Sequence, residues 1–593
     1  MDARGRFAGA LISVLLLGAP ACSAGSPAGA APGSGVSSGT GTPGATGPGA
    51  TAPGSGTPGT GAPKATGSAS GPVREYLVFY AGGAQATTQR AVAAAGGVVA
   101  GRDDRLGYLV VRGSSPERLG AIPSVVGVTP DRQVGTVASL PGVLRAPDGE
   151  RTAAQAPATP LDAAGAPGLS PADPLAGRQW DMRMIGATPT GSYATARGSH
   201  KVLVGVIDTG IDGRHPDIAA NFNRALSRNF VTDQPKDPNG KKLDGACEHP
   251  GCKDPVDEDD DGHGTHVAST IASPINGIGV SGVAPDVSLV NLRAGTDSGY
   301  FFLKPTMDAL TYAADVGVDV VNMSFYVDPW TFNCVANPKD SRADQLEQKG
   351  ILEGMRRALS YARARGVTLI TAIGNGGGDL GRPKKDTASP DYPLGTERQR
   401  TIDNSCLNVP AEIDGVISVS AVGPSGRKAA YSDYGVEQTD IAAPGGDIFD
   451  GGTALGGPRR EILAAAPAAA LRAQGLLDGR GAPKDSAVVR DCHGGACSYY
   501  QYLEGTSMAA PHVTGVAAII ISRFGKPGKG GLYMDPAKVE QMLYATATPK
   551  SCPSPRRYDY GADGSQLCEG GKTANGFFGR GVVNAARAAT ANP

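Results

Sequence analysis

From residue 173 onward, short apolar runs alternate with longer stretches that have the spacing of helices, notably 305–316 and 346–365. The short runs are rich in β-branched residues and are 201–208, 287–293, 318–324, 366–374 and 415–423. Near-continuous apolar strands separated by helices indicate a parallel sheet that is covered on both faces. We therefore expect residues 173–593 to form an α/β domain with a doubly wound, mostly parallel sheet.

A second pattern, between residues 73 and 134, predicts a small separate domain. Alternating or apolar runs at 75–80, 106–113 and 125–134 predict strands. The Ala-rich stretch 85–95 ends at a Gly pair, and Ser115 precedes a proline and a glutamate, so a helix is predicted at each place. The order β-α-β-α-β favours a ferredoxin-like α+β module.

The segments around this module have the composition of linkers and of an export signal. Residues 23–72 are almost entirely Gly, Ala, Pro, Ser and Thr, which predicts a disordered tether, and 135–172 is a loose linker open to proteolysis. Two arginines, a short apolar run and small residues make 1–22 a secretory signal. Cys22 resembles a lipoprotein cleavage cysteine, so the chain is expected outside the cell, either secreted or lipid-anchored.

Charge excludes some partners. The 593 residues include 55 basic and 56 acidic ones, a balance that indicates neither nucleic acid nor a basic membrane-binding surface. No second apolar run is long enough to span a membrane, so no C-terminal anchor is expected.

Nine cysteines are present, and all except Cys22 lie between 247 and 568. An even set in an exported chain indicates disulfides. Nearest-neighbour pairing gives Cys247–Cys252, Cys334–Cys406, Cys492–Cys497 and Cys552–Cys568, although sequence alone leaves the connectivity open. CEHPGC and CHGGAC each contain a histidine, so zinc is an alternative, but neither has the CxxC spacing of structural zinc sites.

Three residues that could take part in catalysis lie in distinctive local sequences. Asp208 ends an apolar strand in VGVIDTGID, His263 opens a helix in DGHGTHVAS, and Ser507 lies in GTSMAAPHV at the start of an apolar helix. Each has a structural alternative, as a turn aspartate, a helix-start histidine and a helix cap. Pro511 cannot donate a hydrogen bond to the Ser507 carbonyl, which predicts an interrupted first turn that exposes the Ser507 hydroxyl.

These three motifs resemble those of the subtilisin-like serine proteases, which have the same chain order of Asp, His and Ser. The resemblance continues through INGIGV, VVNMS, AIGNGGG, VISVSAVG and YSDYG, and covers nearly all of 173–593. It implies that Ser507 is the nucleophile, His263 its general base and Asp208 the residue that orients the imidazole. Asn375, in AIGNGGG, would donate to the oxyanion together with the Ser507 amide.

The resemblance also implies a prodomain and a structural ion. Residues 73–134 look like the inhibitory prodomain that precedes many such proteases and is cut away. Asp217 and Asn276 match calcium-ligand positions, and Asp173 is a third candidate; oxygen ligands of this kind suit Ca²⁺. The acidic run 254–261 is expected to be a solvated loop, with ion binding as the alternative.

One departure concerns the substrate-binding segment. The family usually has Ser-Leu-Gly-Gly where this chain has Ser324, Phe325, Tyr326 and Val327. We expect the aromatic residues and the insertions at 233–260, 326–346 and 447–500 to narrow or reshape the cleft.

The sequence thus predicts a monomeric, exported serine endopeptidase that is made as an autoprocessed zymogen and acts on proteins or peptides. Its own prodomain would inhibit it, and the chemistry itself requires no cofactor. Two alternatives use the same fold: an esterase or amidase, and a catalytically silent scaffold that binds peptides.

Overall fold

The computed structural model describes residues 75–132 and 173–592. The predicted signal segment 1–22 with Cys22, the tether 23–72 and the linker 135–172 lie outside the described residues.

A seven-stranded sheet lies at the centre of the domain that begins at residue 173, with the order β13-β12-β9-β8-β5-β7-β6. Every neighbouring pair is parallel. The strands are β5 (Leu203–Ile207), β6 (Arg228–Asn229), β7 (Ser288–Arg293), β8 (Val320–Met323), β9 (Thr368–Ala372), β12 (Ile417–Val422) and β13 (Ile441–Pro444). From β7 the chain crosses to the far side of β5, so the sheet is doubly wound, as predicted.

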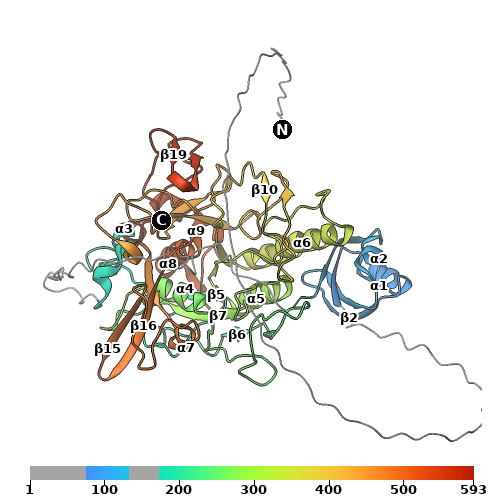
Figure 1. Ribbon diagram of the computed structural model, residues 1–593, viewed down its shortest axis with the longest axis horizontal. Helices are drawn as coiled ribbons and strands as arrows, with labels where there is room; N and C mark the ends of the chain where they lie inside the picture. The colour runs from blue at the N-terminus through green and yellow to red at the C-terminus, as the bar shows by residue number, and fades with distance from the viewer. Residues whose placement is uncertain (1–74, 133–172, 593) are drawn as a thin grey trace, which may run out of the picture. The chain divides into compact units, whose positions relative to one another are not determined.

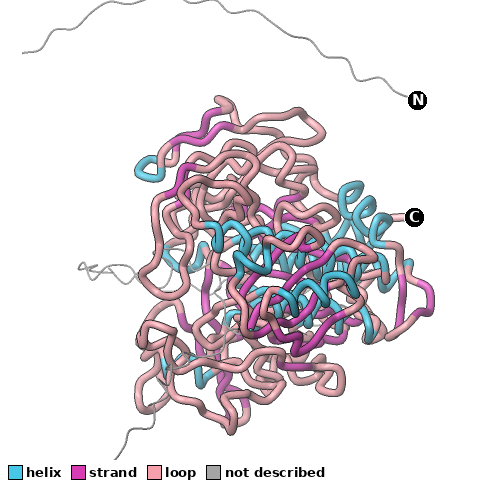
Figure 2. The backbone as a smooth tube through the Cα atoms, turned by 90° about the vertical axis from the view of Figure 1, so that its right-hand side faces the viewer, coloured by secondary structure: helices cyan, strands magenta, loops and turns pink. Residues whose placement is uncertain are grey.

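Helices cover both faces of this sheet (Figures 1 and 2). Helices α4 (His263–Ala272) and α8 (Thr506–Phe524) pack on one face, and α5 (Leu303–Val316) and α6 (Arg342–Ala364) pack on the other. The side chains of β5 alternate between the two cores: Val204 and Val206 contact the first pair of helices, and Leu203 and Ile207 the second. This alternation explains why the strand is apolar throughout.

Helix α8 is the one helix in the described parts of the chain that is long and apolar enough to cross a membrane, by length and composition. Of its most apolar window, 83% is buried inside the protein. Its apolar side chains therefore pack in the core between the sheet and α4.

Shorter elements complete this domain. The helices are α3 (Trp180–Ile185), α7 (Ala468–Ala473), α9 (Pro536–Thr546) and α10 (Ala585–Thr590). Strands β14 (Ile462–Ala465), β16 (Ala496–Leu503) and β15 (Val488–His493) form an antiparallel sheet that begins within the predicted insertion at 447–500 and ends just after it. Three two-stranded ribbons are β10 (Lys385–Asp386) with β11 (Arg400–Thr401), β17 (Lys526–Gly528) with β18 (Gly531–Tyr533), and β19 (Arg557–Asp559) with β20 (Ser565–Leu567).

The N-terminal module is an antiparallel sheet of order β2-β3-β1-β4 with two helices. Its elements are β1 (Glu75–Tyr80), α1 (Gln85–Ala94), β2 (Val98–Asp103), β3 (Tyr108–Arg112), α2 (Pro116–Gly120) and β4 (Val125–Pro130). Strand β2 was not predicted, because it is an edge strand with partly exposed residues and a register shift at Gly101. With it, the order becomes β-α-β-β-α-β, the full ferredoxin-like arrangement.

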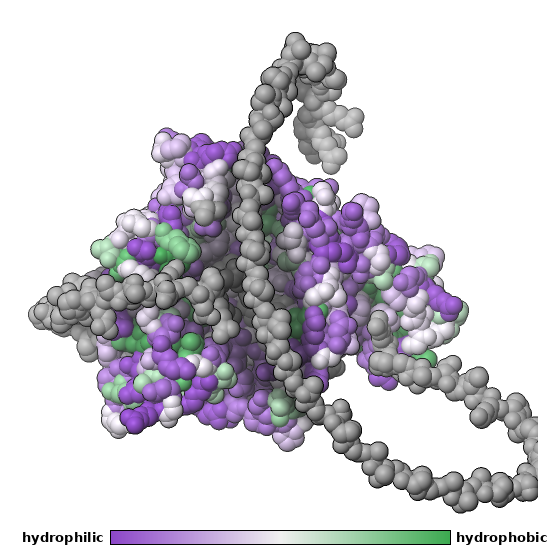
Figure 3. Space-filling view, in the orientation of Figure 1, coloured by the Kyte–Doolittle hydropathy of each residue, from purple (hydrophilic) through white to green (hydrophobic). Residues whose placement is uncertain are grey.

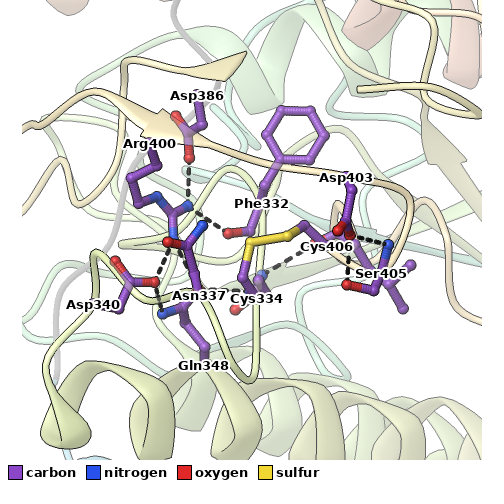
Figure 4. Close-up of a disulfide and its surroundings, with 12 residues drawn as sticks. Phe332, Cys334, Asn337, Asp340, Gln348, Asp386, Arg400, Asp403, Ser405 and Cys406 are labelled. Atoms are coloured by element: carbon purple, nitrogen blue, oxygen red, sulfur yellow. Dashed lines mark hydrogen bonds and ion pairs between the residues drawn. A yellow bond between two sulfur atoms is a disulfide. The ribbon is translucent and has the colours of Figure 1, made fainter. Parts of the chain in front are cut away.

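All four predicted disulfides are formed. This pairing leaves none of the eight cysteines to bind zinc, so the alternative is excluded for them. Figure 4 shows how Cys334–Cys406 joins the insertion after β8 to the loop that follows β11. Beside it, the buried Arg400 guanidinium pairs with Asp340 (2.8 Å) and with Asp386. Ion pairs as well as the disulfide therefore fix this insertion in place.

Candidate active site

Asp208 and His263 form a hydrogen-bonded pair at the carboxyl edge of the sheet. Asp208 directly follows β5 and is fully buried, and His263 is the first residue of α4. The distance from His263 Nδ1 to Asp208 Oδ1 is 2.7 Å. His263 Nε2 is buried and makes no hydrogen bond within the described residues. Nδ1 is thus committed to the aspartate, and Nε2 is the nitrogen free to accept a proton.

The surroundings make this imidazole unusually basic. Burial lowers the pKa of His263, but the charge of Asp208 and its hydrogen bond, with the charges of Asp261 and Asp259, outweigh burial and raise it to about 9. The imidazolium form is stabilised here, as a general base requires once it has taken a proton.

The acidic run before His263 builds the turn that holds the histidine. Asp259 is 3% exposed and accepts hydrogen bonds from Thr209 Oγ1 (3.0 Å) and Thr265 Oγ1 (2.6 Å). Asp261 accepts one from the His263 backbone amide (3.0 Å). The prediction of a solvated loop over 254–261 was therefore wrong for Asp259, and also for Asp254 and Asp257, which are 5% and 4% exposed. The position of Asp259 four residues before His263 was the available signal.

Ser507 is the second residue of α8, which runs unbroken past Pro511. The predicted interruption of the first turn was wrong. Pro511 has no N–H to donate to the Ser507 carbonyl, but this carbonyl accepts a hydrogen bond from Ser324 Oγ instead (3.0 Å). In return Ser507 Oγ donates to the Ser324 carbonyl (3.2 Å). The prediction of an exposed hydroxyl was also wrong, since Ser507 is 4% exposed.

Asn375, three residues after β9, is anchored to the start of α8. Its Oδ1 accepts hydrogen bonds from the Thr506 amide (2.9 Å) and the Thr506 hydroxyl (2.8 Å). A Cβ placed on Gly505 would lie 3.7 Å from Asn375 Nδ2 and 3.6 Å from the Ser507 nitrogen. Both predicted oxyanion donors therefore border the same small space beside Gly505. The Ser507 amide lies in the first helical turn, where amides have no partner within the helix.

The three residues predicted to bind substrate have different roles in the structure. Ser324 is fully buried and supports Ser507. Phe325 is 3% exposed, and its ring stacks on Phe301 at a centroid distance of 4.2 Å, so its side chain belongs to the core. Tyr326 lines a small cleft at Ser507 and a larger cavity that adjoins it, and its hydroxyl donates to Asp391 (2.6 Å). The predicted narrowing by two aromatics is therefore wrong for Phe325.

Asp173, Asp217 and Asn276 come together, as the family resemblance implied. Asn276 Nδ2 donates to Asp217 Oδ1 (3.0 Å), and the Gly277 amide donates to Asp173 Oδ1 (2.8 Å). These contacts join the loop after α4 to the segments that begin the domain and follow β5.

The remaining carboxylate oxygens of this cluster are also occupied by protein donors. Asp217 Oδ2 accepts hydrogen bonds from the Val280 amide (2.9 Å) and the Tyr500 hydroxyl (2.9 Å). Asp173 Oδ2 accepts one from the Ser281 hydroxyl. Calcium needs six to eight oxygen lone pairs that face the ion, whereas N–H and O–H groups point at these oxygens. As arranged, the cluster does not fit a calcium site.

A second acidic cluster, Asp233, Asp254 and Asp297, brings carboxylate oxygens within 4.8 Å of one another. The guanidinium of Arg293, fully buried, pairs with Asp233 (3.0 Å), with Asp297 (2.9 Å) and with Asp254. An arginine already supplies the positive charge that a cation would bring here.

Comparison with known proteins identifies the fold. Residues 199–581 match the Subtilase family. The chain belongs to the subtilase family. The predicted family, its fold and its class of enzyme, serine endopeptidase, are thereby confirmed.

This subtilase has many relatives among characterised proteins. It is 27% identical to subtilisin DY of Bacillus licheniformis over 58% of this chain and 84% of the relative. It is 26% identical to the thermophilic serine proteinase of Bacillus sp. (strain AK1), over 56% of this chain and 55% of the relative. A solved epidermin leader peptide processing serine protease from Staphylococcus aureus has a TM-score of 0.55 and 20% identity, covering 88% of this chain and 100% of that one, and shows the same fold.

Proposed function

We propose that this subtilase is an exported serine endopeptidase that hydrolyses peptide bonds through an acyl-enzyme. The observation that carries the proposal is the buried pair of Asp208 and His263, which leaves Nε2 without a hydrogen bond at the edge of the sheet where Ser507 begins α8. A serine hydroxyl becomes a nucleophile when such a base removes its proton during attack.

In the reaction, Ser507 Oγ leaves the Ser324 carbonyl and gives its proton to His263 Nε2 as it bonds to the substrate carbonyl carbon. Asp208 stays ionised and stabilises the imidazolium. His263 then returns the proton to the leaving amine, and the acyl-enzyme is hydrolysed by water activated in the same way.

The oxyanion of each tetrahedral intermediate would be held by Asn375 Nδ2 and the Ser507 amide. Both border the space beside Gly505, and the two hydrogen bonds from Thr506 hold the asparagine side chain in one orientation. Preorganised donors of this kind are worth roughly 100- to 1000-fold in rate each.

We propose that the N-terminal module is an inhibitory prodomain. Leu77 and Phe79 of β1 pack in the same buried core as α5 and α6. A Cβ on Gly127 of β4 would lie 2.7 Å from the Gly350 Cα of α6, so strand and helix are in direct contact. Such an extensive apolar contact suits a module that assists folding and remains bound until it is cut away.

The end of the described module lies against the loops of the catalytic domain. Arg132 pairs with Glu347 of α6 (2.9 Å), and its guanidinium lies 5.4 Å from the centroid of the Tyr392 ring. We propose that the chain is cut after this anchor, within 135–172, by Ser507 of the same or a neighbouring molecule.

Export is proposed from the signal-like residues 1–22, and Cys22 offers a lipid anchor as an alternative to free secretion. We also propose a monomer. On the face drawn in Figure 3, hydrophobic residues occur in small patches among hydrophilic ones, and large exposed apolar patches are what mark association surfaces.

A fluorophosphonate probe tests the nucleophile. The mature wild type should be labelled, and Ser507→Ala should not; absence of labelling in the folded wild type would favour the silent scaffold. Digestion of a peptide library, compared with simple ester and amide substrates, then separates an endopeptidase from an esterase or amidase.

A further inference from the structure

A cavity of about 710 Å³ opens beside the candidate catalytic residues. It shares Tyr326, Gly374, Asn375 and Asn408 with the small cleft at Ser507, so the two adjoin. When a substrate carbonyl lies at Ser507 with its oxygen at Asn375, the nearest side chain is that of the residue on the amino side of the cleaved bond. This cavity is where that side chain would enter.

A buried carboxylate lies on the wall of this cavity. Asp433 is 5% exposed and lines the cavity, and its Oδ1 accepts a hydrogen bond from the Gly378 amide (2.7 Å). A Cβ on Gly374 would lie 2.3 Å from Asp433 Oδ2 and 3.6 Å from Asn408 Nδ2. Gly374, with φ +121°, thus leaves room for a carboxylate oxygen one residue away from the oxyanion donor Asn375.

Asp433 differs from the neighbouring carboxylates in its ion pairs. Of the other carboxylates lining the cavity, Asp379 pairs with Arg382 (3.1 Å) and Asp386 pairs with Arg400. Among the described residues, no Lys, Arg or His nitrogen forms an ion pair with Asp433 within 4.0 Å.

A buried lysine lies near Asp433 but is used elsewhere. The Lys428 ammonium donates to the carbonyl oxygens of Ala429 (2.8 Å) and Ser432. Burial raises the pKa of Asp433 to about 6, and hydrogen bonds from Gly378 and Gly376 and the charge of Lys428 limit the rise. A pKa of about 6 leaves most of the carboxylate ionised at neutral pH. A buried charge without an ion-pair partner among the described residues gains most from a cation that enters beside it.

Cations also line this cavity, and they lie toward solvent. Lys384 and Lys385 are both exposed, as is Arg557. Exposed charges are screened by water and salt, whereas a charge in the interior of the cavity is screened much less. The interior therefore selects for positive charge despite the basic rim.

We propose that Asp433 is a specificity-determining residue that directs cleavage to the carboxyl side of lysine or arginine. The lysine or arginine side chain would pass between Tyr326 and Gly374 and place its cationic end against Asp433 Oδ2. This proposal rests on the proposed endopeptidase function and names its substrate class.

The test uses the mature enzyme, produced from the full-length chain, and matched peptides that differ only at the residue before the cleaved bond. Arginine is compared with citrulline, which has the same shape without the charge, and lysine with norleucine. We expect wild-type kcat/KM to be at least about tenfold higher for each charged peptide. Asp433→Asn should lower it about 30-fold or more for the charged peptides and leave the neutral ones within about threefold.

Asp379→Asn is the matched control, because Asp379 lines the same cavity and is already paired with Arg382. It should leave the ratio of arginine to citrulline unchanged. If Asp433→Asn does not fold, the wild type alone decides: a peptidyl argininal should inhibit it more strongly than the matching leucinal.

Three outcomes would overturn the proposal. They are a wild type that prefers neutral residues, an Asp433→Asn variant that loses activity equally on charged and neutral peptides, and an Asp379→Asn variant that lowers the ratio as much as Asp433→Asn does. Failure of the proposed function is recognised separately, because a folded wild type would then neither react with a fluorophosphonate nor cleave any peptide.

Discussion

Ser324 and Ser507 exchange two hydrogen bonds, each hydroxyl donating to the carbonyl of the other residue. Ser324 follows β8 and Ser507 is the second residue of α8, so the contact fixes the candidate nucleophile to the central sheet. Because Pro511 has no N–H, the Ser507 carbonyl lacks the helical donor that any other residue would supply. The hydroxyl of Ser324, just after β8, takes the place of that donor.

Ser324→Ala should therefore leave the buried Ser507 carbonyl without a partner. A lost partner of this kind costs about 1–3 kcal/mol in the free energy of unfolding. Denaturant unfolding would measure the loss, made in the Ser507→Ala background to prevent self-digestion.

Pro511→Ala provides the matching control, because alanine at 511 restores an amide that can reach the Ser507 carbonyl. The double variant Ser324→Ala/Pro511→Ala should recover part of the stability that Ser324→Ala loses. If the stability losses of the two single variants simply add in the double variant, the Ser324 hydroxyl and the amide at 511 do not donate to the same carbonyl.

The sheet and the four site motifs could be predicted because apolar strands and short turn motifs are local features. Asp208, Ser324 and Asn375 all follow strands, and parallel strands bring such residues to one edge. The disulfides could be predicted because each cysteine pairs with its nearest neighbour in the sequence. Strand β2 was missed because an exposed edge strand carries little hydrophobic signal.

Contacts between distant segments could not be predicted. Phe325 could equally have pointed toward the cleft, and only its stacking on Phe301 decides its direction. The donors that occupy Asp217 include Tyr500, which is 283 residues away in the chain and comes from an inserted hairpin. Nor does the sequence say that Asp433 has no ion pair with another described residue, because the ion pairs of its neighbours form only on folding.

The basicity of His263 sets the pH dependence of catalysis. Nε2 must be unprotonated to take the Ser507 proton, and the pKa of His263 is about 9 because Asp208 and the nearby acids outweigh the lowering effect of burial. We expect kcat/KM to rise about tenfold per pH unit below the pKa and to level off above about pH 9. A plateau that begins near pH 6.5, the ordinary histidine value, would contradict this environment.

Asp208→Asn should separate charge from shape at the same pair. The amide removes the charge that raises the pKa of His263, so the profile should move to lower pH, and kcat should fall on the order of 10⁴-fold. Fluorophosphonate labelling rates across the pH range would measure both effects. Asp212→Asn, at an aspartate in the turn after β5 that is not bonded to the histidine, serves as the control and should keep the wild-type profile.

The same pair contributes to stability at low pH. The pKa of His263 is higher in the folded chain, about 9, than the ordinary value of 6.5. Its contribution is therefore complete below about pH 6.5 and is lost as the pH rises through 9. In the Ser507→Ala background, His263→Gln should cost more free energy of unfolding at pH 6 than at pH 10, and an equal cost at both would contradict the shift.

Maturation tests the domain plan. Ser507→Ala removes the nucleophile with little steric change, so this variant should fold and remain full length after removal of any signal segment. The wild type should shorten to a form that begins between about 135 and 173, as N-terminal sequencing would show. A trace of active wild type added to the variant distinguishes cleavage between molecules from cleavage within one. Normal maturation of purified Ser507→Ala would show that another nucleophile cuts the linker.

The cluster of Asp173, Asp217 and Asn276 predicts how the enzyme responds to calcium. Because protein donors already occupy every carboxylate oxygen there, the melting temperature should be the same in excess EGTA and in added Ca²⁺. Tyr500→Phe removes one of those donors and should cost about 1.5–3 kcal/mol, the range for a hydrogen bond to a charged group. Tyr499→Phe, which loses a bond to the neutral Gly481 carbonyl, is the matched control and should cost less. A melting temperature that falls in EGTA and recovers with Ca²⁺ would instead mean that an ion displaces the Tyr500 hydroxyl from Asp217.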